Sequence, residues 1–412
     1  MRTLKVRVLL LSIVLLVLSA GRTFSDDAHY INNNIGNRAS GMGGAYTAVS
    51  DDSSGCFYNP AGIAFAPGNK LSASVNAIQT STKKYKNVLR GTNGSYSDWS
   101  QKSFSLMPNF FGIIQKFGPG MVGMSYAVPD SIQRRQKQTF SSIQGTSTID
   151  TFSINMNDFD KSYFLGPSYA LKLTDSLSVG GTVYYHYRDS QFITNYFIQF
   201  QSGEERIYNT YSTKSSSGWQ PNIGAMWEPL DNLAFGISIS RLYITSTDFD
   251  IQTIINDDVD PSDLVYNLYS SSDNTDHPFV TKLGAAWFYS PSFLLSLDLK
   301  YFEEIDDKQF VLNAALGAEY YINDYIALRG GLYSDLANTP ELTKGVINKY
   351  NEHLDIYGAS FSTTLFSNRT SITLGINYSF GSGDSQIISG DTTIRDVEYS
   401  NLAFQIATSF SY

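Results

Sequence analysis

The stretch TSITLGINYSF, residues 370–380, decides the fold, because its apolar and polar side chains alternate along its whole length. From Ile372 onward the even-numbered positions are apolar or aromatic, and the odd-numbered positions are small or polar. A period of two predicts a β-strand with two unlike faces. The same alternation recurs in residues 293–301 and 310–322. Alternation alone also fits a soluble β-sandwich with one face in water, so the connections between strands have to separate the two folds.

The connections between the alternating segments are of two kinds, short and long, and the two kinds alternate along the chain. Six short turns fall at residues 118–120, 174–176, 228–232, 290–292, 323–324 and 367–368. We interpret the polar stretches between them as loops, mostly long, at residues 83–98, 130–160, 201–216, 249–278, 339–354 and 382–397, with a brief one at 305–308. Short turns at one end and longer loops at the other are typical of transmembrane β-barrels. With a first strand near 70–82 and a last near 398–412, the six hairpins predict an all-β, antiparallel transmembrane barrel of about 14 strands.

The composition supports a barrel in a membrane. Only 16% of the residues are charged and 42% are hydrophobic, while the mean hydropathy is -0.17. Soluble proteins carry about 25% charged residues, and helical membrane proteins need apolar runs of about 20 residues, which we do not find after residue 25. An aromatic content of 14% excludes intrinsic disorder. In a barrel, residues that face lipid alternate with residues that face a polar lumen, and the two contributions to the hydropathy cancel.

Residues 1–25 have the layout of a secretory signal peptide: a basic start, an apolar run at residues 8–18, and small residues after it. The apolar run spans only about 17 Å as a helix, which is too short for a membrane anchor. Cleavage after Ala20 and cleavage after Ser25 both fit the pattern. The net charge of -9 becomes more negative when this basic segment is removed. An acidic protein of this kind is not expected to bind nucleic acid.

Cysteine and histidine usage indicates neither a metal site nor a cofactor. Cys56 is the single cysteine, and a small residue in a glycine-rich loop explains it better than a reactive thiol. The four histidines are scattered without metal-ligand spacing. An enzyme in the barrel wall would need a nucleophile beside a base. His186 is the only histidine in a confidently predicted strand, and no serine can be paired with it, so we do not expect an enzyme.

Residues 26–69 do not alternate and are rich in glycine and turn-forming residues, among them Gly43 and Gly44. Glycines permit a tight approach of one backbone to another. A segment of this length is too short to fold as an independent domain. We therefore expect this part, named here the hatch segment, to pack inside the barrel, and a loose periplasmic extension is the alternative. The predicted organisation is a signal peptide at 1–25, the hatch segment at 26–69 and the barrel at 70–412.

Two motifs in the hatch segment make the sequence recognisable. ASGMGGAYTAVSDD at residues 39–52 and YNPAGIA at residues 58–64 closely resemble the N-terminal hatch of the FadL/TodX family. The runs MPNF at 107–110 and YAVP at 126–129 resemble the second and third strands of that family. The resemblance implies a 14-stranded barrel that carries long-chain fatty acids or other hydrophobic compounds across the outer membrane by passive diffusion. PorV-like barrels share parts of these motifs, so a structural or secretion-shuttle role is the alternative.

The resemblance also implies a route for the ligand. In the family, the ligand enters between outer loops, reaches a pocket in the lumen and leaves through a lateral gap made by a kinked third strand. The hatch blocks the straight path, and its Asn-Pro-Ala turn, here Asn59, Pro60 and Ala61, lies near the kink. Gly123 in the predicted third strand permits either a bend or tight packing against the hatch segment. Pro129 cannot donate a hydrogen bond to a strand ladder.

Several charged residues fall on the lumen side by the phase of the alternation: Lys172, His186, Arg188, Lys282, Asp298, Lys300, Glu319 and Arg329. A lysine or arginine that faces lipid at the midplane would cost about 2–4 kcal/mol. A hydrophobic acid needs an apolar slot and a cation for its carboxylate. We predict ligand contacts for Arg188, Lys282 and Arg329, and mutual pairing of these charges is the alternative. Arg241 breaks the pattern: it lies at the rim, lies near a bulge, or shows that the strand register assigned here is wrong.

The alternation continues through residues 401–412 and ends on the aromatic Tyr412. A last strand with an aromatic end resembles the signal that outer-membrane proteins present to the barrel-assembly machinery. Aromatic residues near other strand ends fit the girdles at membrane interfaces. We therefore expect a protein of the outer membrane of Gram-negative type. Its expected partners are outer-membrane lipids, hydrophobic small molecules and, through the last strand, the assembly machinery.

Overall fold

The structure, a computed structural model, describes residues 28–30, 33–144, 149–257, 265–272, 274–306, 308–388 and 391–412. The predicted signal peptide lies outside these residues. Three short helical elements occur in the described part of the hatch segment: α2 (Asn37–Gly41), α3 (Gly55–Tyr58) and the 3₁₀ helix η1 (Pro60–Phe65). No helix in the described part of the chain is long and apolar enough to cross a membrane.

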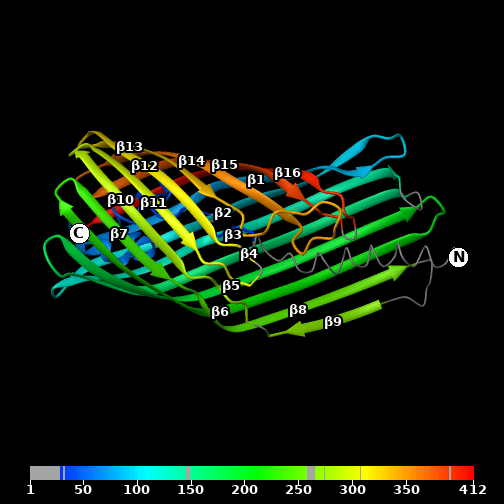
Figure 1. The fold of residues 1–412 in the computed structure, drawn as a ribbon, viewed down its shortest axis with the longest axis horizontal. Coiled ribbons are helices and arrows are strands. Elements are labelled where there is room, and N and C mark those ends of the chain that lie inside the picture. The colour runs from blue at the N-terminus through cyan, green and yellow to red at the C-terminus, as the bar shows by residue number, and fades with distance from the viewer. Residues whose placement is uncertain are drawn as a thin grey trace.

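The rest of the described chain is built from antiparallel strands (Figure 1). The strands are β1 (Lys70–Arg90), β2 (Tyr96–Phe117), β3 (Gly120–Ile143), β4 (Ile149–Lys172), β5 (Leu177–Phe200), β6 (Glu205–Leu230), β7 (Leu233–Ser240), β8 (Tyr243–Asp257), β9 (Val265–Ser271), β10 (Val280–Ser290), β11 (Phe293–Phe302), β12 (Val311–Asn323), β13 (Ile326–Asp335), β14 (Glu352–Phe366), β15 (Thr370–Ser385) and β16 (Arg395–Ser411). Each of the six predicted short turns coincides with a connection between two consecutive strands, although residues 120, 228–230, 290 and 323 belong to the adjoining strands.

The sheet closes on itself to form a barrel of 14 strands, as the sequence predicts. Strands β1–β7 and β10–β16 form the ring, in which β10 pairs with β7 and β1 pairs with β16. Strand β8 continues the path of β7 outward, and both pair with β6. Strand β9 pairs back on β8 alone. The hairpin β8–β9 is thus an outward extension of one wall and adds no strand to the ring.

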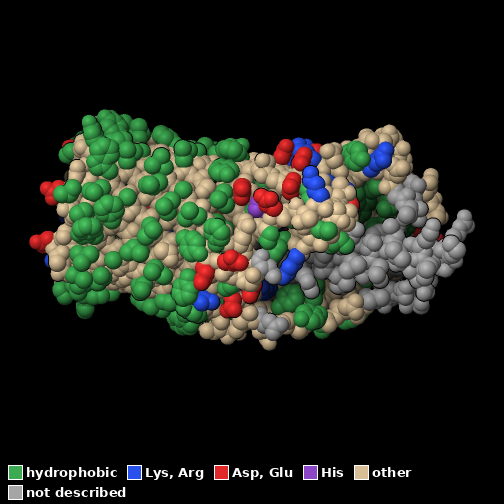
Figure 2. Space-filling model, viewed as in Figure 1, with side chains coloured by type: hydrophobic (Ala, Val, Ile, Leu, Met, Phe, Trp, Pro, Cys, Tyr) green, Lys and Arg blue, Asp and Glu red, His purple; other side chains and the backbone are tan. Residues whose placement is uncertain are grey.

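The barrel wall has apolar side chains on its outer face and polar or charged side chains on its inner face, the reverse of a soluble protein. On β11, Leu297 and Leu299 are exposed, whereas Asp298 and Lys300 between and after them are 0% and 6% exposed. Figure 2 shows apolar side chains spread over one part of the outer surface, with charged side chains gathered beyond it toward the long loops. On β6 the outward apolar positions run from Trp227 to Trp219, a distance of roughly 26 Å along the strand. An apolar band about 25 Å tall is the signature of a barrel that spans a bilayer.

The strands of the ring range from 8 residues in β7 to 26 residues in β6. Strands β10–β13 have 10 to 13 residues, close to the roughly 9–11 that cross a bilayer. Strands β3–β6 have 24 to 26 residues. They project well beyond β10–β13 at the end opposite the C-terminus (Figure 1). One side of the barrel therefore rises as a tall wall above the membrane.

This tall wall corrects part of the loop prediction. The stretches predicted as loops at 83–98, 130–160, 201–216 and 249–278 consist largely of strand. Outside the bilayer the outward face meets water instead of lipid, so the alternation of apolar and polar residues fades while backbone pairing continues. The loop interpretation was wrong for these stretches because it used hydropathy as the sign of a strand. The stretches 339–354 and 382–397 are loops over most of their length.

The described part of the hatch segment lies inside the barrel, because it forms hydrogen bonds with strands from β5 round to β16. Its partners are Ser178 on β5, Ala225 on β6, Asp298 on β11, Glu319 on β12, Ser360 on β14 and Gln405 on β16. Its side chains Ile35, Met42 and Tyr46 are 0% exposed and belong to one core cluster with residues of the wall. These contacts agree with packing inside the barrel and not with a loose extension.

Glycines of the wall let the hatch backbone approach closely. A Cβ atom on Gly284 would lie 2.7 Å from the backbone nitrogen of Ala48, and one on Gly317 would lie 2.7 Å from the carbonyl oxygen of Met42. Contacts this short do not occur for real Cβ atoms, so these inward positions have to be glycine for the segment to sit where it does. The wall and the hatch segment are fitted to each other at backbone level.

Candidate functional site

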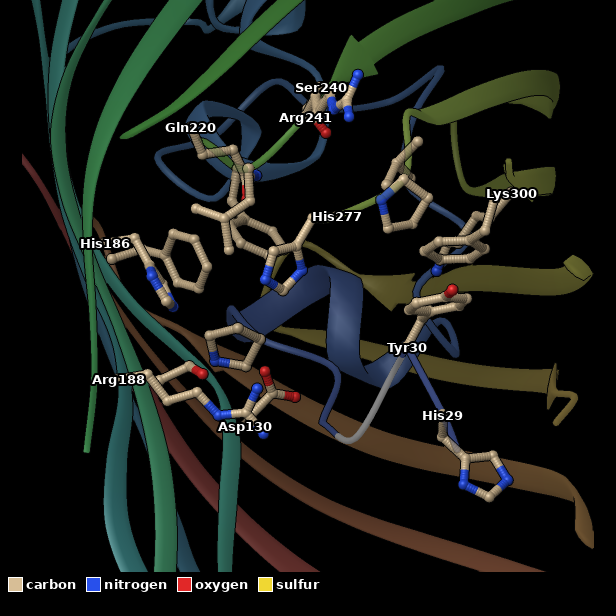
Figure 3. A pocket seen from close by; sticks show the side chains of 18 of the residues that line it. His29, Tyr30, Asp130, His186, Arg188, Gln220, Ser240, Arg241, His277 and Lys300 are labelled. Atoms are coloured by element: carbon tan, nitrogen blue, oxygen red, sulfur yellow. The ribbon is translucent and has the colours of Figure 1, made fainter. Parts of the chain in front are cut away.

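A cavity of about 220 Å³ lies where the hatch segment meets the inner face of the wall. The hatch segment lines it with Tyr30, Phe57 and Tyr58, and the wall lines it with residues of β3–β7, β10 and β11 and of the chain that precedes β8 and β10. Figure 3 shows side chains from these separate elements around one space, with His186, His277 and Arg188 on one side and Tyr30 and Lys300 on the other. Residues from both ends of the sequence thus form one site.

Aromatic rings supply the apolar part of the cavity. Phe57 packs edge-on against Tyr58 and Phe164, with ring centroids 5.6 and 6.3 Å apart. Tyr30 stacks on Phe302, with centroids 4.5 Å apart. These contacts hold the rings in fixed orientations, because aromatic pairs prefer edge-to-face and offset-stacked geometries. The cavity therefore has preformed apolar surfaces for a ligand.

The charges that line the cavity are predominantly positive. Its described lining contains one acidic residue, Asp130, and five basic residues: Arg188, Arg241, Lys282, Lys300 and Lys308. Arg188 is paired with Asp160 on the neighbouring strand, at 2.8 Å between Nη2 and Oδ2. Excess positive charge in a partly apolar cavity favours an anionic group on the ligand.

Lys282 and Lys300 differ from Arg188 because no carboxylate of the described residues pairs with them. They occupy directly opposed positions of β10 and β11. The Lys282 ammonium lies 5.1 Å from the centroid of the Phe57 ring, and its hydrogen bond to the Phe57 carbonyl is long, at 3.4 Å. The Lys300 ammonium lies 6.0 Å from the Tyr58 ring centroid. Among the described residues, neither ammonium forms an ion pair. Ring faces and one carbonyl are their direct contacts, and the carboxylates of Asp298 and, for Lys300, Asp335 act on them only at longer range.

Two further polar atoms at the cavity are buried without a hydrogen-bond partner among the described residues: Nδ1 of His186 and Nε of Arg241. The His186 ring is 2% exposed and packs on Phe164, with centroids 4.7 Å apart. A buried polar group without a partner costs about 1–3 kcal/mol. Polar atoms of a ligand in the cavity would remove that cost.

The structure explains the anomalous Arg241. It lies directly after β7, at the break that separates β7 from β8, and the ladder between β7 and β10 ends at Ser240 and Val280. The ladder of β6 with β8 also shifts its register between Ser217 and Gly218. Of the three alternatives for Arg241, the structure favours a position near a bulge, and the same break places Arg241 at the cavity.

Of the three predicted ligand contacts, the structure brings two together. Arg188 and Lys282 line the cavity, whereas Arg329 is not part of its lining. Arg329 forms a buried ion pair with Glu319 and a hydrogen bond with Thr364. Its side chain is held between β12, β13 and β14, and it follows the alternative of mutual pairing.

Lys300, Tyr58 and Arg241 line the cavity but were not chosen from sequence as ligand contacts. For Lys300 a signal existed. In a hairpin that turns at residue 291, residues equally far from the turn face each other. Lys282 and Lys300 are both nine residues from it and are therefore paired. For Tyr58 no signal existed, because its place depends on how the hatch segment folds inside the barrel.

The glycines and the Asn-Pro-Ala turn of the hatch segment have local structural roles. Gly43 and Gly44 have φ angles of 65° and 81°, the left-handed region that glycine adopts without strain. Asn59 accepts a hydrogen bond from the Ala61 amide at 3.1 Å and so caps η1, whose first residue is Pro60. Its Nδ2 donates to the carbonyl of Ala225. The Ser178 hydroxyl on β5 donates to the Ala61 carbonyl. The turn therefore sits against β5 and β6, which provide its hydrogen bonds with the wall among the described residues.

Strand β3 contains the two residues predicted for a lateral opening. Gly123 lies in an unbroken ladder with Ile114 on one side and Ser168 on the other. A Cβ atom there would lie 2.7 Å from Sγ of Cys56, so the structure places Gly123 in tight packing with the hatch segment. Pro129 lies at a register shift between β3 and β4, and it lines the cavity.

The wall has a gap in its backbone pairing at the same level. Strands β2 and β3 pair at Ser103 with Arg134 and again at Phe110 with Ala127, and no pair between these two occurs in this described part of the wall. Pro129 falls within the unpaired stretch of β3. The gap thus adjoins the cavity through a residue that lines it.

No group of three or more histidine, cysteine, aspartate or glutamate side chains in the described residues is arranged to hold a metal ion. Cys56 is 0% exposed, and burial raises the pKa of its thiol to about 11. A thiol with this pKa is neutral at physiological pH and therefore a poor nucleophile.

Comparison with known proteins agrees with this architecture. Residues 21–275, more than half of the chain, match the family described as outer membrane protein transport protein (OMPP1/FadL/TodX). None of the curated proteins compared with the chain matches it. Among solved structures, a FadL homologue from Pseudomonas aeruginosa has a TM-score of 0.66 at 14% identity, covering 93% of this chain and 100% of that chain. The toluene transporter TodX from P. putida has a TM-score of 0.62 at 15% identity, covering 92% and 99%.

The toluene transporter TbuX from Ralstonia pickettii has a TM-score of 0.58 at 13% identity, covering 92% of this chain and 99% of that chain. At such identities a structural likeness establishes the fold, and the sequence match establishes the family. That family consists of transport proteins and not of enzymes. The chain belongs to the OMPP1/FadL/TodX family of outer-membrane transport proteins for hydrophobic compounds.

Proposed function

We propose that this protein takes up long-chain fatty acids or other hydrophobic compounds across the outer membrane by passive diffusion, and that the ligand leaves the barrel sideways. One observation carries the proposal. A cavity with aromatic surfaces and two lysines, Lys282 and Lys300, that form no ion pair with a described residue lies beside a gap in the β2–β3 ladder. The cavity offers a place for an amphipathic molecule, and the gap offers it a way to the bilayer.

The tall wall supports an entrance from outside. The inward faces of its outer strands carry an apolar cluster that includes Trp99, Phe140, Ile154, Tyr196 and Tyr208. Such a lining favours hydrophobic molecules, because each Å² of apolar surface removed from water contributes about 25 cal/mol. A ligand would descend along this surface to the cavity and would pass Pro129 and Asp130 on its way to the gap.

The hatch segment closes the straight path to the periplasm in this proposal. Its anchors bind buried carboxylates of the wall: Arg38 binds Glu319 at 2.6 Å, and the Thr47 hydroxyl donates to Asp298 at 2.6 Å. Together with the backbone-level fit at the wall glycines, these anchors favour a segment that stays in place during transport. A lateral exit then lets the ligand leave without displacing the hatch segment.

The location follows from the same architecture. We propose that residues 1–25 direct export, and that the strand ending at Tyr412 is recognised by the barrel-assembly machinery. Phe410 and Tyr412 stack on each other at the end of that strand and are both exposed. Exposed aromatic rings at the end of a membrane strand suit an interface with lipid or with an assembly partner.

Closing the gap tests the proposed route. In a Cys56→Ser background, cysteines replace Ser105 on β2 and Ser131 on β3, which both lie in the unpaired stretch, and a flexible bismaleimide joins them across the gap. The matched control joins cysteines at Ile113 and Met124, which already face each other in the ladder. Uptake of labelled oleate and of toluene into proteoliposomes is then measured with and without the linker.

We expect the linker across the gap to abolish most uptake, and the control linker to leave uptake unchanged. Equal uptake in both linked proteins would overturn the lateral exit. Complete failure of the unlinked protein to take up either compound would overturn the transport function itself and return attention to a structural or secretion-shuttle role.

A further inference from the structure

The cavity combines a small volume, aromatic surfaces and two lysines, the buried Lys300 and the partly buried Lys282, neither of which forms an ion pair with a described residue. We propose that its ligand is a small aromatic carboxylate, a single ring with an acid group on a short side chain. This inference rests on the proposed transport function and narrows its substrate class. Size, charge and ring contacts each argue for it separately.

The size argument compares the cavity with cavities of known capacity. An engineered apolar cavity of roughly 150 Å³ binds benzene, whereas pockets for larger organic ligands begin near 300 Å³. The cavity of about 220 Å³ lies between them. It accommodates one ring and a short acidic substituent, and it is too small to enclose the tail of a long-chain fatty acid.

The charge argument rests on Lys282 and Lys300. Among the described residues, the carboxylates that act on these lysines are Asp298 and, for Lys300, Asp335, and neither forms an ion pair with them. The Asp298 carboxylate accepts hydrogen bonds from the Tyr46 and Thr47 amides and from the Thr47 hydroxyl. A buried cation without a partner retains most of its desolvation penalty. A carboxylate between the two ammonium groups would offset that penalty, and a neutral hydrocarbon would not.

The ring argument joins the two lysines to the aromatic surfaces. Both ammonium groups lie over rings of the hatch segment, Lys282 over Phe57 and Lys300 over Tyr58. An acid group bound by the lysines therefore has its own ring beside Phe57 and Tyr58, where edge-to-face packing is available. On the opposite side, the unpartnered Nδ1 of His186 is available to a polar substituent of the ligand.

The test compares an acid with its uncharged analogue on the purified full-length mature protein in detergent. The probes are 3-phenylpropanoate, the neutral 3-phenylpropan-1-ol and oleate, with affinities measured by isothermal titration calorimetry. We expect the wild-type protein to bind the acid at least about tenfold more tightly than the alcohol. This comparison needs no variant, so it stands even if a variant fails to fold.

The variants locate the site. Lys282→Met combined with Lys300→Met is expected to lower the affinity for the acid by about tenfold or more while the affinity for the alcohol changes little. Lys282→Arg keeps the charge and is expected to retain the preference for the acid. Lys172→Met is the matched control, because Lys172 is exposed and lies over the Phe65 ring, away from the cavity lining.

Equal affinity for acid and alcohol, or no binding of either, would overturn the inference. The proposed function fails separately, when proteoliposomes take up neither oleate nor toluene. Uptake of these compounds by a protein without preference for the aromatic acid would leave the function standing and remove only the substrate class.

Discussion

Two buried clusters of basic residues join the hatch segment to the barrel, and they differ in one respect. Around Glu319, the guanidinium groups of Arg38 and Arg329 share one carboxylate, and Arg38 also binds Asp51 at 2.6 Å. At the cavity, Lys282 and Lys300 face each other, and among the described residues neither forms an ion pair. Position on the lumen side does not distinguish the clusters. The clusters differ in whether carboxylates pair with their cations. We therefore assign a structural role to the Glu319 cluster and ligand binding to the lysine cluster.

The largest effect is expected at the paired cluster. Glu319→Gln leaves two buried guanidinium groups without their shared carboxylate, and loss of one partner from a buried ion pair costs about 3–5 kcal/mol. We expect the free energy of unfolding in urea to fall by that order. The matched change in the other cluster, Lys282→Met, removes an unpaired charge and is expected to leave stability unchanged or higher. A larger loss for Lys282→Met than for Glu319→Gln would reverse the assignment of the two clusters.

An intermediate effect is expected at Asp298, which links the lysine cluster to the hatch segment. Asp298→Asn weakens the hydrogen bonds that Tyr46 and Thr47 donate to the carboxylate. Hydrogen bonds to charged groups contribute about 1.5–3 kcal/mol each, so we expect a stability loss of about 2 kcal/mol. The change also removes the negative charge nearest to Lys300, and affinity for 3-phenylpropanoate should rise. Weaker binding of this acid in the variant would argue against an anion site at the lysines.

The smallest effect is expected at Cys56, which reports on the hatch segment without disturbing it. The thiol is fully buried, and burial raises its pKa to about 11. Because a raised pKa keeps the thiol protonated at all lower pH values, we expect slow maleimide labelling at pH 7.5 in the native protein. Glu319→Gln should speed up labelling by loosening the segment, and Lys282→Met should not. Rapid labelling of the native protein would show that the segment leaves its place readily.

The sequence predicts the membrane-embedded half of the barrel well, because lipid on one side and a polar lumen on the other impose a period of two. The outer halves of β3–β6 do not lie between lipid and lumen, so their sequence lacks the alternation and was predicted to form loops. The break at Arg241 was visible as an anomaly in the pattern, since a charge on the lipid face had to be explained by a change in geometry. What the anomaly meant became clear only from the ladders around it.

The site was partly accessible from sequence. Strand phase placed Lys282, Lys300 and Arg188 on the lumen side, and the turn at 290–292 contained the pairing of the two lysines. The role of Arg329 was not accessible, because it depends on Arg38, which reaches Glu319 from 281 positions away in the chain. Contacts of the hatch segment with the barrel have no sequence period, and they decide which basic residues remain available to a ligand.

A crystal structure of the protein soaked with 3-phenylpropanoate tests the central claim most directly. Our account predicts the carboxylate within hydrogen-bond distance of the ammonium groups of Lys282 and Lys300, and the ring beside Phe57 and Tyr58. Binding of the carboxylate at Arg329, with Glu319 displaced and the lysine cavity unoccupied, would contradict it.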